Sequence, residues 1–395
     1  MSRYAGNLRI FCIFLVLGGL SAGLPVPVRA DFTITAVQPV AGGTSSRLYG
    51  INNVGVGTGE STSAFSNVAQ AVQTTSGLGA VTLGFNSGGW STRGLAINDS
   101  NVIVGQAQSY TPSGPVSRAF VYSGSTQGPM TLPGLVANGS ATAQAVSNGG
   151  VIAGSAVGAD GQNHAVTWDL QGNILSLGGF TSGGPSQAFG INSAGKVTGS
   201  ASTVQGGSQA FLYAPGPTPG IAGEFKNLGA LTLNGASQGN AVNNSGHVVG
   251  WSASDQGTSH AFAYLNDQMV DLQHSLFNGW NSQALAINNS DWIVGKLTQT
   301  GGSSSAFLWT AATGLVNLNS LVSNLSGWTL ESATGINDHG QIVGYGLLNG
   351  QTRGFILNPV PTVANGSVPE PSSLVLCTLA AATLALGRRF RRRSS

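Results

Sequence analysis

The sequence predicts an all-β protein, a seven-bladed β-propeller of four-stranded repeats, closed by an N-terminal strand and flanked by two apolar targeting helices. Three observations predict this architecture. One short phrase recurs seven times along the 395-residue chain. Each copy is followed by further strand-like segments, and the last copy lacks a strand that the N-terminal segment supplies. Repeats of this length with four short strands are typical of propeller blades.

The recurring phrase is a β-hairpin signature. AFGINSAGKVTGS (188–200) and ALAINNSDWIVGK (284–296) are two of its copies. Each copy contains an apolar residue that we call the anchor, and successive anchors are 45 to 51 residues apart. The anchors are Ile51, Ile97, Val146, Ile191, Val242, Ile287 and Ile336. A glycine follows every anchor eight residues later, so the repeat is systematic.

The residues inside the phrase are those of a tight turn between two strands, named a and b. Gly, Asn or Asp stands four residues after every anchor, and these residue types tolerate the positive φ that a tight hairpin turn requires. The residue directly after the anchor is Asn in six copies and Ser147 in the other. Its side chain is expected to hydrogen-bond the turn backbone.

Two more strands, c and d, are predicted in each repeat. Strand c is expected at SAFS (63–66), RAFVY, HAVTW, QAFLY, HAFAY, SAFLW and RGFIL, and strand d at VTLG, MTLP, LSLG, KNLG, VDLQ and VNLN. There are seven segments of type c but only six of type d after them. Val37 precedes the first anchor by fourteen residues, as Leu83 and Leu132 precede theirs. The N-terminal segment therefore predicts the missing d strand, which favours a closed ring over an open solenoid with capping units.

The first 30 residues have the pattern of a secretory signal peptide. Basic Arg3 and Arg9 precede an apolar run, and small residues end the segment. The alternative is a first transmembrane helix, but the run is shorter than the roughly 20 residues that span a bilayer. We predict cleavage between Ala30 and Asp31, which leaves residues 31–358 as the propeller.

The end of the chain has the pattern of a sorting signal. After a linker at 359–367, the segment 368–395 contains a short apolar span that is expected to form a transmembrane helix. The predicted sorting motif is Val368, Pro369, Glu370 and Pro371, and the predicted cytoplasmic stop is Arg388, Arg389, Arg391, Arg392 and Arg393. The alternative is a permanent anchor that is never cut.

Composition excludes several classes of function. Removing both ends leaves seven basic and twelve acidic residues, so the body is acidic although the whole chain has a net charge of +2. Nucleic-acid binding is not expected, because it requires a basic surface. Cys12 and Cys377 both lie in the terminal segments, so no disulfide is expected in the body.

No catalytic, metal or cofactor site is predicted in the body. His164 and His260 occupy equivalent positions, but other repeats have Arg or Ser there, which indicates a solvent-facing position and not a zinc ligand. INDSN, INNSD and INDHG partly match calcium loops, with too few carboxylates for an EF-hand. A weak calcium site at one turn stays open as an alternative.

SHAFAY, NHAVTW and SSAFLW, together with the anchor phrase, resemble the bacterial extracellular HAF-repeat proteins from about residue 31 to 358. The tail, with its Val-Pro-Glu-Pro motif, apolar span and arginine cluster, is similar to the PEP-CTERM sorting signal. The resemblance implies a Gram-negative bacterium that makes exopolysaccharide, and processing by an exosortase, a membrane enzyme. It also implies transient anchoring at the inner membrane before delivery to the outer envelope or the extracellular space.

We therefore expect an exported, non-enzymatic protein of the envelope or extracellular matrix, structural or adhesive, with exopolysaccharide as a candidate partner. The alternative is a polysaccharide hydrolase or lyase with its site in the propeller channel. Acidic residues clustered at the channel mouth would favour the enzyme.

Overall fold

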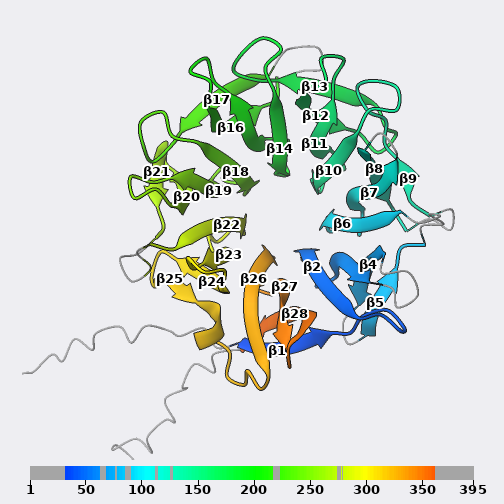
Figure 1. Ribbon diagram of the computed structural model, residues 1–395, viewed down its shortest axis with the longest axis vertical. Helices are drawn as coiled ribbons and strands as arrows, with labels where there is room; N and C mark the ends of the chain where they lie inside the picture. Colours follow the sequence, from blue (N-terminus) through cyan, green and yellow to red (C-terminus); the bar gives the residue numbers. More distant parts are fainter. Residues whose placement is uncertain are drawn as a thin grey trace, which may run out of the picture.

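The computed structural model describes residues 32–360, except 63–67, 76–77, 85–89, 112–113, 125–127, 217–222, 274–276 and 278. Seven four-stranded antiparallel sheets stand in a ring, and in each sheet strand a, which precedes the a–b turn, lies nearest the centre (Figure 1). This confirms the predicted seven-bladed propeller. The predicted signal peptide, its cleavage site at Ala30 and Asp31, and the tail from residue 361 lie outside the described residues. Within the described part, no helix is long and apolar enough to span a membrane.

The strands follow one another around the ring in chain order. Blade 1 contains β2 (Ser45–Ile51), β3 (Gly57–Thr62), β4 (Ala69–Thr75) and β5 (Leu78–Thr82). Blade 2 contains β6 (Ser91–Ile97), β7 (Ile103–Thr111), β8 (Gly114–Tyr122) and β9 (Met130–Thr131). Blade 3 contains β10 (Ala141–Val146), β11 (Ile152–Val157), β12 (Asn163–Trp168) and β13 (Ile174–Gly178). Blade 4 contains β14 (Ser186–Ile191), β15 (Val197–Ser202), β16 (Ser208–Ala214) and β17 (Glu224–Gly229).

Blade 5 contains β18 (Ser237–Val242), β19 (Val248–Ala253), β20 (Ser259–Leu265) and β21 (Gln268–Asp271). Blade 6 contains β22 (Asn281–Ile287), β23 (Ile293–Thr298), β24 (Ser304–Thr310) and β25 (Gly314–Asn317), followed by the 3₁₀ helix η2 (Leu318–Ser320). Blade 7 contains β26 (Trp328–Ile336), β27 (Ile342–Leu348), β28 (Gln351–Pro359) and, from the other end of the chain, β1 (Phe32–Val37).

The N-terminal strand closes the ring as predicted. β1 pairs antiparallel with β28 along its whole length, from Phe32 opposite Pro359 to Val37 opposite Gly354. Pro359, which the sequence assigned to the linker, is thus the last residue of a strand. Proline is tolerated there because it lies at a strand end. Both ends of the described chain leave at the face that carries the a–b turns, since a Cβ on turn residue Gly340 would lie 3.3 Å from the Pro359 side chain.

The predicted c strand of blade 1 at residues 63–66 is wrong. Residues 63–66 lie outside the described residues, and the third strand of that sheet is β4. Val72 of β4 pairs with Gly59 in the same way that Phe120 pairs with Gly105 in blade 2. The true copy of the motif is therefore QAVQT (70–74), which lacks the aromatic residue that identifies the other copies.

A β-bulge explains the invariant glycine eight residues after each anchor. In all seven inner strands the pairing with strand b skips one residue, two positions before the anchor. The bulge brings a carbonyl oxygen of strand a against the glycine. A Cβ added to Gly105 would overlap the carbonyl oxygen of Arg93, and one added to Gly295 would overlap that of Gln283. Only glycine fits at this position.

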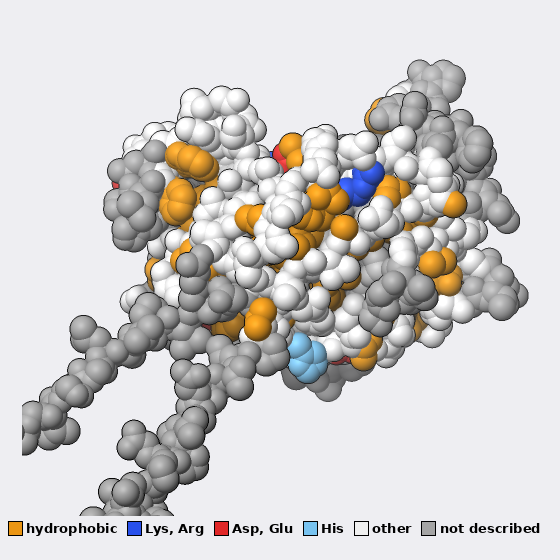
Figure 2. Space-filling model, turned by 90° about the horizontal axis from the view of Figure 1, so that it is seen from below, with side chains coloured by type: hydrophobic (Ala, Val, Ile, Leu, Met, Phe, Trp, Pro, Cys, Tyr) orange, Lys and Arg blue, Asp and Glu red, His pale blue; other side chains and the backbone are white. Residues whose placement is uncertain are grey.

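The core lies between neighbouring blades. Phe120, Phe211, Phe262, Phe307 and Phe355 occupy equivalent positions of strand c and are fully buried. Burying such a side chain contributes about 1.5–3 kcal/mol. The outer surface carries few charged groups, and Figure 2 shows a side face on which uncharged polar side chains, backbone and scattered apolar side chains predominate. Apolar clusters that contain residues of two neighbouring blades, such as Leu228 with Val242 and Phe262, join the blades.

Buried hydroxyl groups add a polar contact at five of the seven junctions. Ser46, Thr92, Ser186, Ser237 and Ser282 stand five residues before their anchors. Each hydroxyl accepts a hydrogen bond from a backbone N–H in strand c of the preceding blade, for example 2.9 Å from Ala165 N to Ser186 Oγ. The sequence analysis missed this link, although the recurrence of Ser or Thr at one repeat position is visible in the sequence.

Candidate functional site

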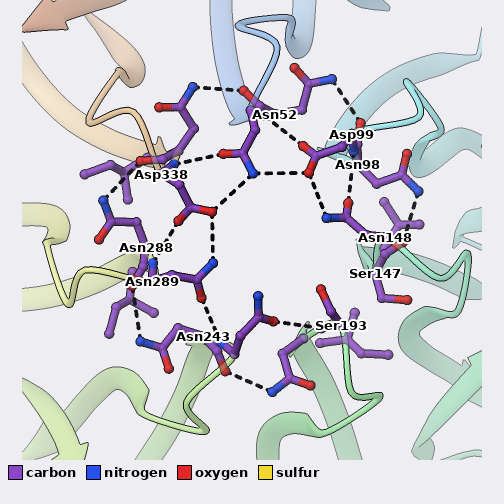
Figure 3. A pocket seen from close by; sticks show the side chains of 18 of the residues that line it. Asn52, Asn98, Asp99, Ser147, Asn148, Ser193, Asn243, Asn288, Asn289 and Asp338 are labelled. Carbon is purple, nitrogen blue, oxygen red and sulfur yellow. Dashed lines mark hydrogen bonds between the residues drawn. The ribbon is translucent and has the colours of Figure 1, made fainter.

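The candidate site is the mouth of the central channel at the a–b turns. The residues that line it are the seven anchors and the two residues after each anchor (Figure 3). They surround a cavity of about 180 Å³. The sequence identified these turns as structural and did not predict that they meet in one cavity.

The turns have the predicted backbone geometry. The residue four after the anchor has a positive φ in every blade, including Asn101 at 60° and Asp291 at 59°. The side chain directly after the anchor accepts hydrogen bonds from turn backbone N–H groups, as Asn98 Oδ1 does from Ser100 and Val102. Ser147 does the same through its hydroxyl, which accepts from Val151 N. Both predictions are confirmed.

The same asparagines also join neighbouring blades, which the sequence analysis did not anticipate. The Nδ2 group of each donates to the backbone carbonyl of the equivalent residue in the next blade. The links run from Asn52 to Asn98, from Asn98 to Ser147, from Asn192 to Asn243, from Asn243 to Asn288, from Asn288 to Asn337 and from Asn337 back to Asn52, at 2.9 to 3.2 Å. All six of these asparagine side chains belong to buried residues.

A second ring of hydrogen bonds lies next to the first. In six of the seven blades, the residue two after the anchor donates its backbone N–H to a side-chain oxygen of its counterpart in the next blade. These links run from Asn53 to Asp99, from Asp99 to Asn148, from Ser193 to Asn244, from Asn244 to Asn289, from Asn289 to Asp338 and from Asp338 to Asn53, at 2.8 to 3.1 Å. We call the two sets together the double ring.

The double ring is interrupted once, at the junction of blades 3 and 4. Ser147 has no amide to donate to the carbonyl of Asn192, and the short Ser193 side chain does not accept from Asn148 N in the contacts of the described residues. Both interruptions have the same cause, since serine replaces a longer side chain at each position. We call this junction the seam.

Two carboxylates, Asp99 of blade 2 and Asp338 of blade 7, lie on either side of Asn53 at the mouth. Asn53 Nδ2 lies 3.1 Å from Asp99 Oδ2 and 3.2 Å from Asp338 Oδ2. The two carboxylates therefore share one amide nitrogen as a hydrogen-bond donor. Asp99 also accepts from Asn148 Nδ2, and Asp338 from Asn289 Nδ2. Each carboxylate thus accepts hydrogen bonds from amides on both sides, and none of the described residues that line the cavity is Lys, Arg or His.

The histidines are placed differently from the prediction. His260 is not solvent-facing: it is only 5% exposed, with Nδ1 2.7 Å from Asp271 Oδ2 and Nε2 3.0 Å from Thr258 Oγ1. The reason is that strand d of blade 5 supplies a carboxylate for it. His164 is half-buried and contacts Asp160. No group of three or more His, Cys, Asp and Glu side chains comes together in the described part of the chain.

Among the described Asp, Glu, Lys and Arg residues, Glu60 is the most deeply buried, at 4% exposed. Its carboxylate lies 3.1 Å from Arg47 Nη1 and 2.7 Å from Arg93 Nε, and it accepts from the hydroxyl of Tyr49 at 2.9 Å. Burial, followed by the nearby Glu60 carboxylate, raises the pKa of Tyr49 well above its usual range. Because Arg93 belongs to blade 2, the cluster joins blades 1 and 2 and is satisfied internally.

One solved structure with a TM-score above 0.5 shares the fold at low sequence identity, and others are similar at lower scores. A puromycin hydrolase S511A mutant complexed with PGG has a TM-score of 0.52 at 13% identity, over 76% of this chain and 50% of that chain. TolB from Acinetobacter baumannii has a TM-score of 0.44 at 13% identity, over 66% of this chain and 64% of that one. Virginiamycin B lyase from Staphylococcus aureus has a TM-score of 0.45 at 10% identity, over 84% of this chain and 99% of that chain. The chain thus spans one half to two thirds of the first two relatives, and the likeness concerns the fold alone.

Sequence comparison adds one family. No curated protein matches the chain. The model of a family described as "Protein of unknown function (DUF3466)" matches residues 185–368, which is less than half of the chain and covers blades 4 to 7 from Pro185 onward.

Proposed function

We propose that the chain is an exported, non-enzymatic protein of the cell envelope or extracellular matrix that acts as a structural or adhesive partner of exopolysaccharide. The observation that supports a non-catalytic role is the double ring. The amides and carboxylates at the channel mouth are used to join the blades, as in the contacts of Asn53 with Asp99 and Asp338. A catalytic acid or base instead needs an oxygen that reaches the substrate proton.

Delivery by a PEP-CTERM tail is the second part of the proposal. The propeller closes between Phe32 and Pro359, so cleavage anywhere beyond Val360 leaves all the described strands in place. An exosortase is therefore able to separate the tail from a body that stays folded. We expect Glu370→Ala to accumulate an uncut, membrane-bound form. Peptides containing Arg388 to Arg393 in the released protein, detected by mass spectrometry, would instead show that the tail is kept.

A glycan array tests the binding role. A protein spanning residues 31–360 is expected to be retained by polysaccharides of the producing organism and to leave their length unchanged during incubation. Retention of none of them would contradict the adhesive function. The HAF-repeat resemblance adds no specific ligand to this expectation.

A polysaccharide hydrolase or lyase is the second candidate, favoured by the approach of Asp99 and Asp338 to one amide. Paired carboxylates on either side of a glycosidic bond are the usual arrangement in glycosidases. If the protein releases new sugar ends, Asp99→Asn and Asp338→Asn should each abolish that activity. If it releases none, the carboxylates serve the double ring.

A further inference from the structure

A second cavity lies between blades 5 and 6, on the face opposite the channel mouth. It has a volume of about 330 Å³ and is lined by Ser259, Asn281, Gln283, Lys296 and Thr298. Strand a begins and strand b ends at this face, whereas the channel mouth is where they turn. The volume is at the lower end of the range for small-molecule sites, about 300–1,000 Å³. We call it the Lys296 pocket.

The floor of this pocket is a cross-strand patch of blade 6. Gln283 of β22 stands opposite Lys296 of β23, and Asn281 stands opposite Thr298 two residues along each strand. Side chains of directly paired residues share one face of a sheet, as do residues two apart. Blade 5 contributes Ser259, whose backbone N–H donates to Asn281 Oδ1 at 2.8 Å. The blade junction therefore fixes the shape of the pocket.

Of the seven basic residues in the described body, Lys196 and Lys296 are the two whose side chains have no partner among the described residues, and Lys296 lines this pocket. Arg47, Arg93 and Lys226 pair with carboxylates, and Arg118 and Arg353 donate to backbone carbonyls. Lys296 is half-buried, and its ammonium makes no ion pair or hydrogen bond within the described residues. No Asp or Glu is among the described residues that line the pocket. A partly desolvated cation without a counter-charge is costly, and an anionic ligand would offset that cost.

The remaining groups fit the hydroxyls of a sugar. The Gln283 amide and the Thr298 hydroxyl both donate and accept hydrogen bonds, and neither side chain has a partner among the described residues. In the protein, the Lys296 ammonium lies beside amide and hydroxyl groups. A sugar acid is complementary to this arrangement, because its carboxylate lies beside a ring that carries hydroxyl groups. We propose that the Lys296 pocket binds the carboxylate-bearing sugar of an acidic polysaccharide, with Lys296 as the counter-charge. The inference rests on the proposed polysaccharide binding and names its site and ligand class.

The test compares two sugars that differ only in the carboxylate. Titration of the protein with D-glucuronate and with D-glucose, followed by NMR or calorimetry, should show at least tenfold weaker binding of glucose. Lys296→Met should weaken glucuronate binding at least tenfold, while Lys296→Arg retains most of it. Binding should fall as salt is raised, because the contact is partly exposed.

Lys196→Met is the matched control, since Lys196 also makes no side-chain ion pair in the described residues but lies at an a–b turn outside the pocket. It should bind glucuronate like the unaltered protein. Equal binding of both sugars, or no effect of Lys296→Met, would overturn the inference. If an array retains neutral polysaccharides regardless of Lys296→Met, polysaccharide binding stands and this pocket is excluded. If free glucuronate binds through Lys296 but no polysaccharide is retained, the pocket stands and the adhesive function fails.

Discussion

The channel mouth and the Lys296 pocket are both polar, but the protein uses their polar groups differently. At the mouth, Asn243 uses its Oδ1 for its own turn and its Nδ2 for blade 6. In the pocket, the side chains of Lys296 and Gln283 have no protein partner in the described part of the chain. The comparison teaches that the number of polar residues at a site says little about ligand binding. What matters is whether the fold already satisfies them.

Removing the closing strand should have the largest effect, because the double ring depends on a closed propeller. Deletion of residues 31–40 removes β1 and the buried side chains of Phe32 and Val37. We expect a loss on the order of 5 kcal/mol in the free energy of unfolding, measured by chemical denaturation. Deletion of 361–395 is the control and should leave it unchanged. Equal unfolding curves for the two deletions would refute closure by β1.

Breaking the double ring should have the next largest effect. Asn243→Ala removes hydrogen bonds to Asn288 O and Asp291 Oδ1 and leaves turn N–H groups without their acceptor. A loss of about 3 kcal/mol is expected. Asn244→Ala is a milder control at about 1 kcal/mol, because Asn244 is exposed and accepts one hydrogen bond from the preceding blade. If Asn243→Ala is as mild as Asn244→Ala, the buried links contribute little.

Substitutions of a turn glycine should have a smaller effect on the free energy of unfolding, and they distinguish backbone strain from side-chain packing. Gly195 has a φ of 75°, and the nearest atom to an added Cβ is Pro215 Cγ at an ordinary 3.5 Å. Gly195→Val should therefore cost about 1–2 kcal/mol through strain. Gly195→Asn should cost far less, since Asn101 occupies the equivalent position at 60°. Similar losses in thermal unfolding for both variants would mean that packing decides at this turn.

Repair of the seam should give the smallest change, and in the opposite direction. Ser147→Asn with Ser193→Asn supplies the donor and the acceptor that the other six junctions have. We expect a gain of about 1–2 kcal/mol in the double variant. Ser245→Asn, at an exposed turn position outside the double ring, is the control and should have no such effect. If the double variant is less stable than the unaltered protein, the junction of blades 3 and 4 has no room for the longer asparagine side chains.

The repeat made much of this structure predictable. The anchors, the positive φ at the turns and the closing strand all follow from residue types at fixed spacing. The blade 1 c strand was misplaced because its segment QAVQT (70–74) has no aromatic residue. The blade-to-blade links of the asparagines were missed because their partners are about 45 to 50 residues away, and spacing alone does not show which blades touch. The Lys296 pocket was missed for the same reason, since Ser259 and Lys296 meet only at a blade junction.

The most direct test of the contrast between the two sites measures stability and binding on the same pair of variants. Asn243→Ala should lose about 3 kcal/mol in the free energy of unfolding and still bind D-glucuronate at temperatures where it is folded. Lys296→Met should unfold within about 0.5 kcal/mol of the unaltered protein and lose at least nine tenths of its affinity for glucuronate. If instead Lys296→Met is the destabilised variant and Asn243→Ala the one that loses binding, the assignment of structure to the mouth and ligand to the pocket is wrong.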